Sequence, residues 1–157
     1  MIDEDFPRLV GRALAHDPRA ANVVITVDVV GWRGASDELQ VARAVDMGGV
    51  LITRNRTERA RFQRYIETQR TTRGPNDENA AAASVLLLPR HASTHATDAR
   101  LLLRTTLLLE WYMTLPLPKP TTLLWNHAQQ ALIRAWRPDG YSAADIRIAL
   151  GQLPSAE

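Results

Sequence analysis

The sequence contains no cysteine, which excludes disulfide bonds, catalytic thiols and thiolate metal sites. The same absence agrees with a reducing compartment, and we expect a cytoplasmic protein. The first ten residues, MIDEDFPRLV, are acidic and carry no apolar signal segment. The most apolar run, residues 101–117, is interrupted by Arg104 and Glu110. It is also shorter than the roughly 20 apolar residues that span a membrane, so we expect no membrane partner.

Lysine is almost absent as well, because Lys119 is the only lysine among 19 basic residues. The net charge is only +2, with a pI of about 9.5. A strong preference for arginine suits the recognition of phosphate, because the guanidinium group binds it through two parallel hydrogen bonds. A GC-rich genome, whose codons favour arginine and alanine, gives the same bias without any phosphate ligand. The positions of the arginines therefore say more than their number.

Several catalytic motifs are also missing. The chain has no glycine-rich phosphate loop, no nucleophile elbow and no dinucleotide fingerprint. His91 and His95 are four residues apart, but the glutamate of a zinc-protease motif is absent and no helix is predicted there. A position near a phosphate is the other interpretation of this pair. What remains is a chain of 157 residues, long enough for one domain with a buried core.

The apolar pattern predicts an α/β core centred on residues 22–58. A β-branched strand over 23–29 is followed by a helix that begins after Ser36, by Gly48-Gly49, and by a second strand over 50–53. This βαβ order implies a parallel sheet. Residues 1–2 and 84–88 are the other predicted strands, which gives about four, and the other helices of the core are predicted over 7–16 and 58–69.

The last third of the chain has a different character. Helices are predicted over residues 98–115, from 121 or 122 to 136, and over 142–151. We therefore divide one structural domain into an α/β core, 1–97, and a C-terminal helical extension, 98–157. Its aromatic residues are expected in the core or, alternatively, in a homodimer interface. These aromatic residues are Trp111, Tyr112, Trp125, Trp136 and Tyr141.

Polar residues follow the predicted strands at the edge where ligands gather in open parallel sheets. Asp3 follows the first strand, Asp37 and Glu38 follow the second, and Asn55 follows the third. Carboxylates converging on one edge suit Mg²⁺ or Mn²⁺, which take oxygen ligands and activate water. The alternative is local, because acidic residues in the first turn of a helix are favoured by its dipole, and the acidic N-terminus can simply be solvated.

Seven arginines begin at this same edge and continue into the next predicted helix. They are Arg54, Arg56, Arg59, Arg61, Arg64, Arg70 and Arg73. Arginines beside carboxylates suit the phosphate backbone of RNA or DNA. A solvated helix face is the alternative explanation.

Four segments carry a family resemblance over residues 1–90. They are DEDFP at 3–7, VITVDVVGWRGASDE at 24–38, GGVLITRNR at 48–56 and SVLLLPR at 84–90. Together they resemble the small bacterial PIN-like proteins, which were first grouped as a domain of unknown function and predicted to be toxin–antitoxin nucleases. The resemblance implies a three-layer α/β/α sandwich with a parallel sheet, hydrolysis of RNA assisted by Mg²⁺ or Mn²⁺, and an antitoxin-like protein partner.

The resemblance also implies roles for individual residues. Asp3, Asp37 and Glu38 fall on the acidic catalytic positions, with Asp3, Asp37 and Asn55 as metal ligands. The phosphate contacts are assigned separately, from the basic segment at this edge of the sheet, to Arg54, Arg56 and Arg59.

This sequence departs from the family pattern at the third acidic position. Asn55 and Thr57 stand where the family has two aspartates, and a neutral amide should weaken a divalent site. The first strand is also reduced to Met1 and Ile2. The sequence therefore indicates a PIN-like protein of the metal-dependent ribonuclease lineage, with a weakened metal site. The alternative is an inactive PIN-like scaffold that binds RNA or a protein partner.

Overall fold

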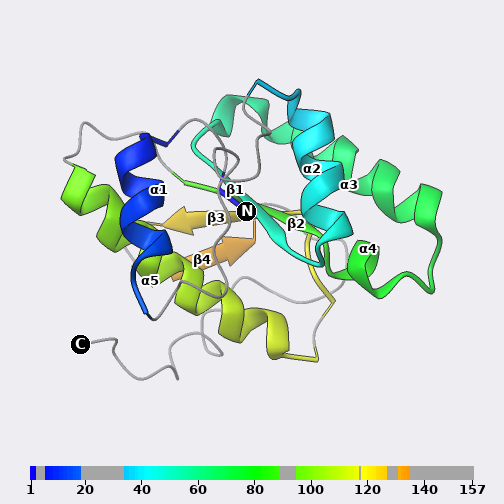
Figure 1. Cartoon of the computed structure of the whole chain (residues 1–157). Helices are drawn as coiled ribbons and strands as arrows, with labels where there is room; N and C mark the ends of the chain where they lie inside the picture. The colour runs from blue at the N-terminus through cyan, green and yellow to red at the C-terminus, as the bar shows by residue number, and fades with distance from the viewer. Residues whose placement is uncertain (3–5, 19–33, 89–94, 117, 127–130, 135–157) are drawn as a thin grey trace.

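A computed structural model describes residues 1–2, 6–18, 34–88, 95–116, 118–126 and 131–134. The helices in this part are α1 (Arg8–Ala15), α2 (Asp37–Asp46), the short 3₁₀ helix η1 (Arg56–Glu58), α3 (Arg59–Arg73), α4 (Glu78–Ala82) and α5 (His95–Thr114). The strands are β1 (Val50–Thr53), β2 (Ser84–Leu87), β3 (Thr122–Asn126) and β4 (Ala131–Arg134). The chain therefore has an α/β fold, as the sequence predicts, and Figure 1 shows its arrangement.

The four strands form one sheet in the order β1-β2-β3-β4. The first three are parallel, and β4 pairs with β3 in the antiparallel direction. On the other side of β1, Ile2 forms a parallel bridge with Ile52, and the Ile52 amide donates to the Met1 carbonyl at 2.7 Å. The predicted first strand is thus confirmed as a short pairing, whereas the strand predicted over 23–29 lies outside the described residues.

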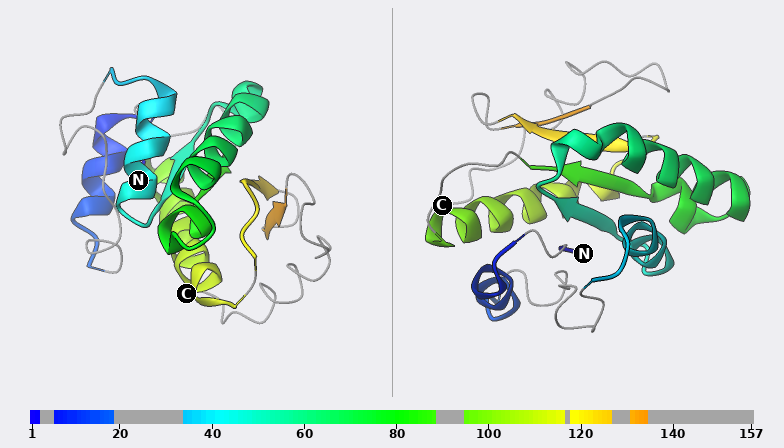
Figure 2. Two further views of the ribbon diagram at one scale, coloured as in Figure 1. Left: turned by 90° about the vertical axis from the view of Figure 1, so that its right-hand side faces the viewer. Right: turned by 90° about the horizontal axis from the view of Figure 1, so that it is seen from above.

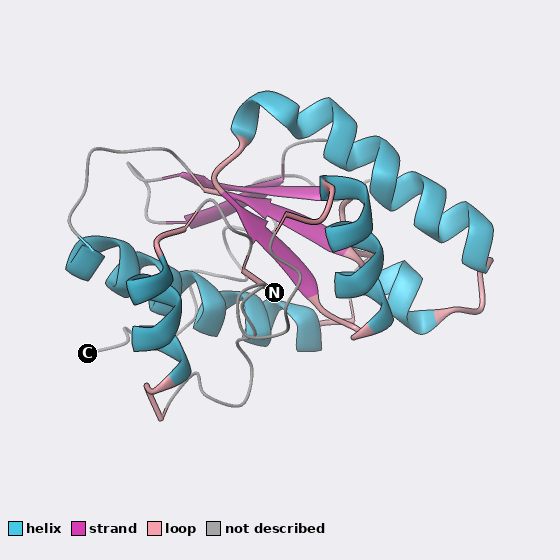
Figure 3. Cartoon of the chain, turned by 45° about the horizontal axis from the view of Figure 1, so that its top comes forward, coloured by secondary structure: helices cyan, strands magenta, loops and turns pink. Residues whose placement is uncertain are grey.

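Both faces of the sheet are covered by helices, as Figure 3 shows for the strands drawn in magenta. Every residue of β1 and of β2 is buried. A continuous buried run is typical of parallel strands that pack on both faces. Val50 and Ile52 face one core cluster, and Leu51 faces the other. The sheet therefore separates two hydrophobic cores.

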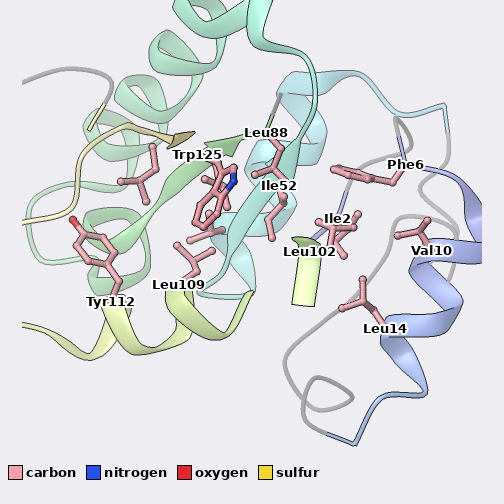
Figure 4. Close-up of a cluster of buried hydrophobic side chains, with 13 residues drawn as sticks. Ile2, Phe6, Val10, Leu14, Ile52, Leu88, Leu102, Leu109, Tyr112 and Trp125 are labelled. Carbon is pink, nitrogen blue, oxygen red and sulfur yellow. The ribbon is translucent and has the colours of Figure 1, made fainter. Parts of the chain in front are cut away.

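The first core lies between the sheet, α1 and α5. Leu102, Leu109 and Tyr112 of α5 contribute to it, and Trp125 of β3 lies among them. Figure 4 shows Trp125 beside Leu109 and Leu88, with Val10 and Leu14 of α1 at the far end of the same cluster. This confirms the core-packing interpretation for Tyr112 and Trp125, whereas Trp136 and Tyr141 lie outside the described residues.

The second core lies between the sheet and α2, α3 and α4. Its centre is formed by Val41 and Val45 of α2 and by Phe62 and Ile66 of α3, each almost fully buried. Ser36 caps α2, because its hydroxyl oxygen accepts a hydrogen bond from the Leu39 amide at 3.3 Å. The chain leaves α2 through Gly48, whose φ of +64° favours glycine.

The prediction of a helix over residues 121–136 is wrong in its described part, which forms β3 and β4. Leu123 and Trp125 face the first core, whereas Leu124 packs against the second. This alternation has the period of a strand. The segment that forms β3 lies beside the edge of β2. As a strand it forms hydrogen bonds with backbone groups of β2 that a helix would leave unpaired. The sheet therefore continues beyond residue 98, and the C-terminal part is not purely helical; Figure 2 shows β4 at its margin.

Other boundaries agree closely with expectation. The strand predicted over 50–53 is β1, and the helix predicted over 98–115 is α5, which begins three residues earlier. The five-residue helix α4 lies between α3 and β2, where no helix is predicted from the sequence. The last predicted helix, 142–151, lies outside the described residues. None of the described helices is both long and apolar enough to cross a membrane.

Candidate nucleic-acid interface

The carboxyl ends of the parallel strands define the edge at which the sequence places its candidate residues. β1 ends at Thr53 and is followed directly by Arg54, Asn55 and Arg56. The arrow of β3 points toward the side on which α5 begins (Figure 1). The first turns of α5 therefore lie at the same edge as the loop after β1, which we call the carboxyl edge.

The loop after β1 is held by short polar contacts. The Asn55 amide donates to the Thr53 hydroxyl at 3.1 Å, and the Thr57 hydroxyl donates to the Asn55 side-chain oxygen Oδ1 at 2.8 Å. Asn55 also precedes η1 as its N-terminal flanking residue. Asn55 and Thr57 therefore stabilise the turn into η1 through a contact that two carboxylates at these positions would make repulsive.

Arg56 reaches across the carboxyl edge. Its Nη2 donates to the main-chain carbonyl of Trp125 at 2.6 Å, although the two residues are 69 positions apart. Because β2 lies between β1 and β3, this side chain crosses the end of the central strand. Burial of its guanidinium lowers the pKa of Arg56 below its ordinary value. An arginine still carries its charge at neutral pH.

Two further arginines lie on aromatic rings beside this crossing. The guanidinium carbon of Arg54 lies 5.2 Å from the centre of the Phe6 ring, and that of Arg104 lies 6.0 Å from the Trp125 ring. Such contacts hold a guanidinium in place. The structure thus brings positive charge from the loop after β1, from η1 and from α5 to one edge of the sheet.

The other arginines of the 54–73 segment differ in role according to their position along α3. Arg61 pairs with Glu58 at 3.0 Å, and Arg64 is exposed on α3. Arg70 and Arg73, near the end of α3, bind the fold itself. Arg70 donates to main-chain carbonyls of α4 and of Lys119, and Arg73 pairs with Asp46. The predicted basic surface is therefore smaller than the sequence suggested, because Arg70 and Arg73 are structural.

Asp37 and Glu38 occupy the first turn of α2, as predicted. Asp37 is half-buried and Glu38 is exposed. Because α2 ends just before β1 begins, its first turn lies toward the carboxyl end of β1. The dipole of α2 is sufficient to favour two acidic residues at this position.

The described residues do not complete a site for a divalent cation. Within the described ranges, no three aspartate, glutamate or histidine side chains are grouped closely enough to hold one ion. The Asn55 oxygen accepts a hydrogen bond from Thr57, and Glu58 pairs with Arg61. Asp3 and His91 lie outside the described residues, as does the side chain of His95. Asp37 and Glu38 are the carboxylates that the described part places in the first turn of α2, toward this loop.

Sequence reasoning missed Arg104 and the contribution of Trp125. The available signal was the single arginine inside the apolar run of 101–109. A charged residue in such a run marks where a buried helix meets solvent or a ligand. The contact between Arg56 and Trp125 had no such signal, since it depends on β3 being a strand.

Comparisons of this chain with models of protein families, with curated proteins and with solved structures found no match.

Proposed function

We propose that this chain is a PIN-like protein that binds RNA at the carboxyl edge of its sheet, with a metal site weakened by Asn55 and Thr57. The ancestry rests on the sequence segments that resemble the PIN-like family. The binding function rests on the arginines of the carboxyl edge. This proposal favours a phosphate-binding role over present catalysis.

The observation that carries the proposal is the side chain of Arg56 lying across the end of β2. It joins the loop after β1 to β3 through the Trp125 carbonyl at 2.6 Å. Only one of its donor groups is used in that bond, and a guanidinium has five N–H donors in all. The remaining donors are available to a phosphate at a fixed position, which gives a fork already oriented for binding.

Arg54 and Arg104 extend this charge in two directions. Both guanidinium groups are placed on aromatic rings, at 5.2 Å from Phe6 and 6.0 Å from Trp125. Fixed cations at successive positions match the repeating phosphates of a single strand better than one isolated phosphate. The substrate class that fits is therefore single-stranded RNA, bound mainly through its backbone.

The direct test is fluorescence anisotropy with a labelled single-stranded RNA in EDTA. We expect Arg54→Ala combined with Arg104→Ala to weaken binding at least tenfold, because each charged contact contributes on the order of 1 kcal/mol. Arg56 is left intact in this test because its side chain also ties β1 to β3.

Arg43→Ala is the matched control. Arg43 lies in the last turn of α2, far along the helix from its first turn, and forms an ion pair with Asp46 at 3.8 Å. This substitution removes one positive charge, half of what the double variant removes, and should change RNA affinity by less than about twofold. Equal losses in the control and in the double variant would show a nonspecific charge effect and would contradict a site at the carboxyl edge.

The second candidate function is a metal-dependent endoribonuclease, acting as the toxin of a toxin–antitoxin pair. The observation in its favour is the half-buried Asp37, held at the start of α2 by the Ser36 cap. Asp37 with Asp3 would hold Mg²⁺ or Mn²⁺, which would activate water for attack on the phosphodiester. Within the described ranges, no group of three side chains supplies the ligands that such an ion requires.

Calorimetry with Mn²⁺ and RNA cleavage assays separate the two candidates. We expect wild type to bind Mn²⁺ weakly, and we expect Asn55→Asp to bind it at least tenfold more tightly, because a carboxylate replaces a neutral amide. Cleavage by wild type that disappears in Asp37→Ala would establish the nuclease. It would contradict the proposal that the protein binds RNA without cleaving it.

A further inference from the structure

A cavity lies between α1 and the first turns of α5, next to the carboxyl edge of the sheet. Its volume is about 150 Å³, and the two helices that form it pack against one another (Figure 1). Its apolar wall consists of Ala13 and Leu14 of α1 and of Ala99 and Leu103 of α5. An apolar protein cavity of about 150 Å³ holds one benzene-sized ring. The cavity therefore fits a single six-membered ring and is too small for two fused rings.

Hydrogen-bond acceptors lie on the side of the cavity that the end of α1 forms. The half-buried Asp17 lines the cavity just after α1 ends, and its main-chain amide donates to the Leu14 carbonyl at 3.1 Å. The C-terminal end of a helix is the negative end of its dipole, and a carboxylate offers about four acceptor positions on its two oxygens. This wall therefore favours a ring that carries a hydrogen-bond donor over one that presents a carbonyl oxygen.

The wall that α5 forms carries positive charge. Arg100 lines the cavity and is exposed, and it forms no ion pair with Asp17 or with any other residue that the structure describes. It lies one helical turn before Arg104, so the two guanidinium groups are neighbours on the exposed side of α5. Arg100 thus extends the arginines of the carboxyl edge to the mouth of the cavity.

We propose that this cavity takes up a cytosine base of the bound single-stranded RNA, a specificity that rests on the proposed function. The pyrimidine ring packs against Leu14, Ala99 and Leu103, and Arg100 binds the phosphate of the same nucleotide. The exocyclic amino group of the base donates to the Asp17 carboxylate, which is the contact that acidic side chains make with cytosine. Uracil has a carbonyl oxygen at that position, and the carboxylate repels it. Bases of single strands are free to turn into such a cavity because they are not paired.

The test compares a labelled oligocytidylate with an oligouridylate of the same length, by fluorescence anisotropy in EDTA on the full chain. The two RNAs carry the same number of phosphates, so the difference in affinity reports the base. We expect the cytidine RNA to bind about fivefold more tightly, because one contact to a base edge discriminates between bases by at least about this factor. Asp17→Asn should remove the preference, because an amide both donates and accepts and can bond either base.

Glu67→Gln is the matched control for this substitution. It also replaces a carboxylate with an amide, but Glu67 lies on α3, which packs on the opposite face of the sheet from α5. The control should therefore keep the preference of wild type for the cytidine RNA.

Ala13→Leu provides a second variant, which changes no charge. It fills the cavity with an apolar side chain, and alanine and leucine are both good helix formers, so α1 should remain stable. We expect the preference for the cytidine RNA to fall below about twofold in this variant. Equal affinity of wild type for the two RNAs, or a preference that persists in Asp17→Asn, would overturn the cytosine site while leaving RNA binding at the carboxyl edge intact. Wild type that binds neither RNA would contradict the proposed function itself, and the cytosine site with it.

Discussion

At the scale of single residues, Lys119 shows how a charged group can serve the fold. Its Nζ donates to the carbonyls of Tyr112 at 3.0 Å and Leu115 at 2.7 Å, and it lies 4.6 Å from the centre of the Tyr112 ring. These are carbonyls at the C-terminal end of α5, where intrahelical donors run out. The only lysine in the chain is therefore a cap for this helix rather than a surface charge.

Replacing Lys119 with methionine should destabilise the protein by about 2 kcal/mol. The substitution retains an apolar stem but leaves two carbonyls without their charged donor. Urea unfolding followed by circular dichroism measures the difference. Arg12→Met, on the exposed face of α1, is the control and should change the free energy of unfolding by less than about 0.5 kcal/mol. A similar loss in both variants would contradict the capping role.

The same residue predicts a dependence on alkaline pH. Burial lowers the pKa of Lys119 below its ordinary value of 10.5. As the pH rises through the folded-state pKa toward 10.5, the folded protein therefore releases this proton before the unfolded chain does. The unfolded state then binds more protons, so this residue's contribution to stability increases with pH. The neutral amine still has two N–H donors for its two carbonyls.

Unfolding experiments on wild type and Lys119→Met at several values of pH in the alkaline range test this sign. The difference in the free energy of unfolding between the two proteins should grow as pH rises toward the ordinary pKa of lysine. A difference that shrinks over this range would mean that the folded state raises the pKa of Lys119.

At the scale of elements, one arginine joins several segments of the second core. Arg70 of α3 donates to the carbonyls of Ala80, Ala81 and Ala83 at 3.3, 3.3 and 2.9 Å. It also donates to the Lys119 carbonyl at 2.7 Å. This side chain therefore connects α3 with the end of α4 and with the segment that leads into β3. A run of carbonyls at the end of a short helix needs such donors.

Arg70→Ala should destabilise the protein by about 3 kcal/mol, because four carbonyl acceptors lose a charged donor together. Arg64→Ala on the exposed face of the same helix should have almost no effect. Thermal unfolding of the two variants makes the comparison. Equal stability of both variants would show that water replaces the Arg70 contacts without loss.

The elements also show where sequence reasoning succeeds and fails. β1 and β2 were predictable because each is a short buried run bounded by glycine or proline. β3 was not, since Trp125, Leu132 and Trp136 fit a helical spacing as well as Leu123 and Trp125 fit a strand. This segment forms a strand because it pairs with the open edge of β2. That pairing is a tertiary contact, which the local sequence pattern does not contain.

At the scale of the whole molecule, part of the candidate site could be predicted from the sequence and part could not. The sequence was sufficient to bring Asp37 and the loop after β1 to one edge, because strand direction fixes that edge. It could not separate the arginines that bind the fold from those that remain at the edge. Arg70 and Arg104 were assigned only when the paths of α4 and β3 were known. Long side chains act over distances that sequence position does not reveal.

The carboxyl edge of the sheet carries Arg54, Arg56 and Arg104. The central claim remains that RNA binds through the arginines and does not need a metal.

The salt dependence of RNA affinity in EDTA tests that claim most directly. For single strands, the logarithm of affinity falls with the logarithm of salt concentration with a slope of about 0.7 per phosphate neutralised. Arg54→Ala combined with Arg104→Ala should therefore reduce the slope by about 1.4, whereas Arg43→Ala should leave it unchanged. RNA binding that requires Mn²⁺, or a slope that is the same in wild type and the double variant, would contradict the account.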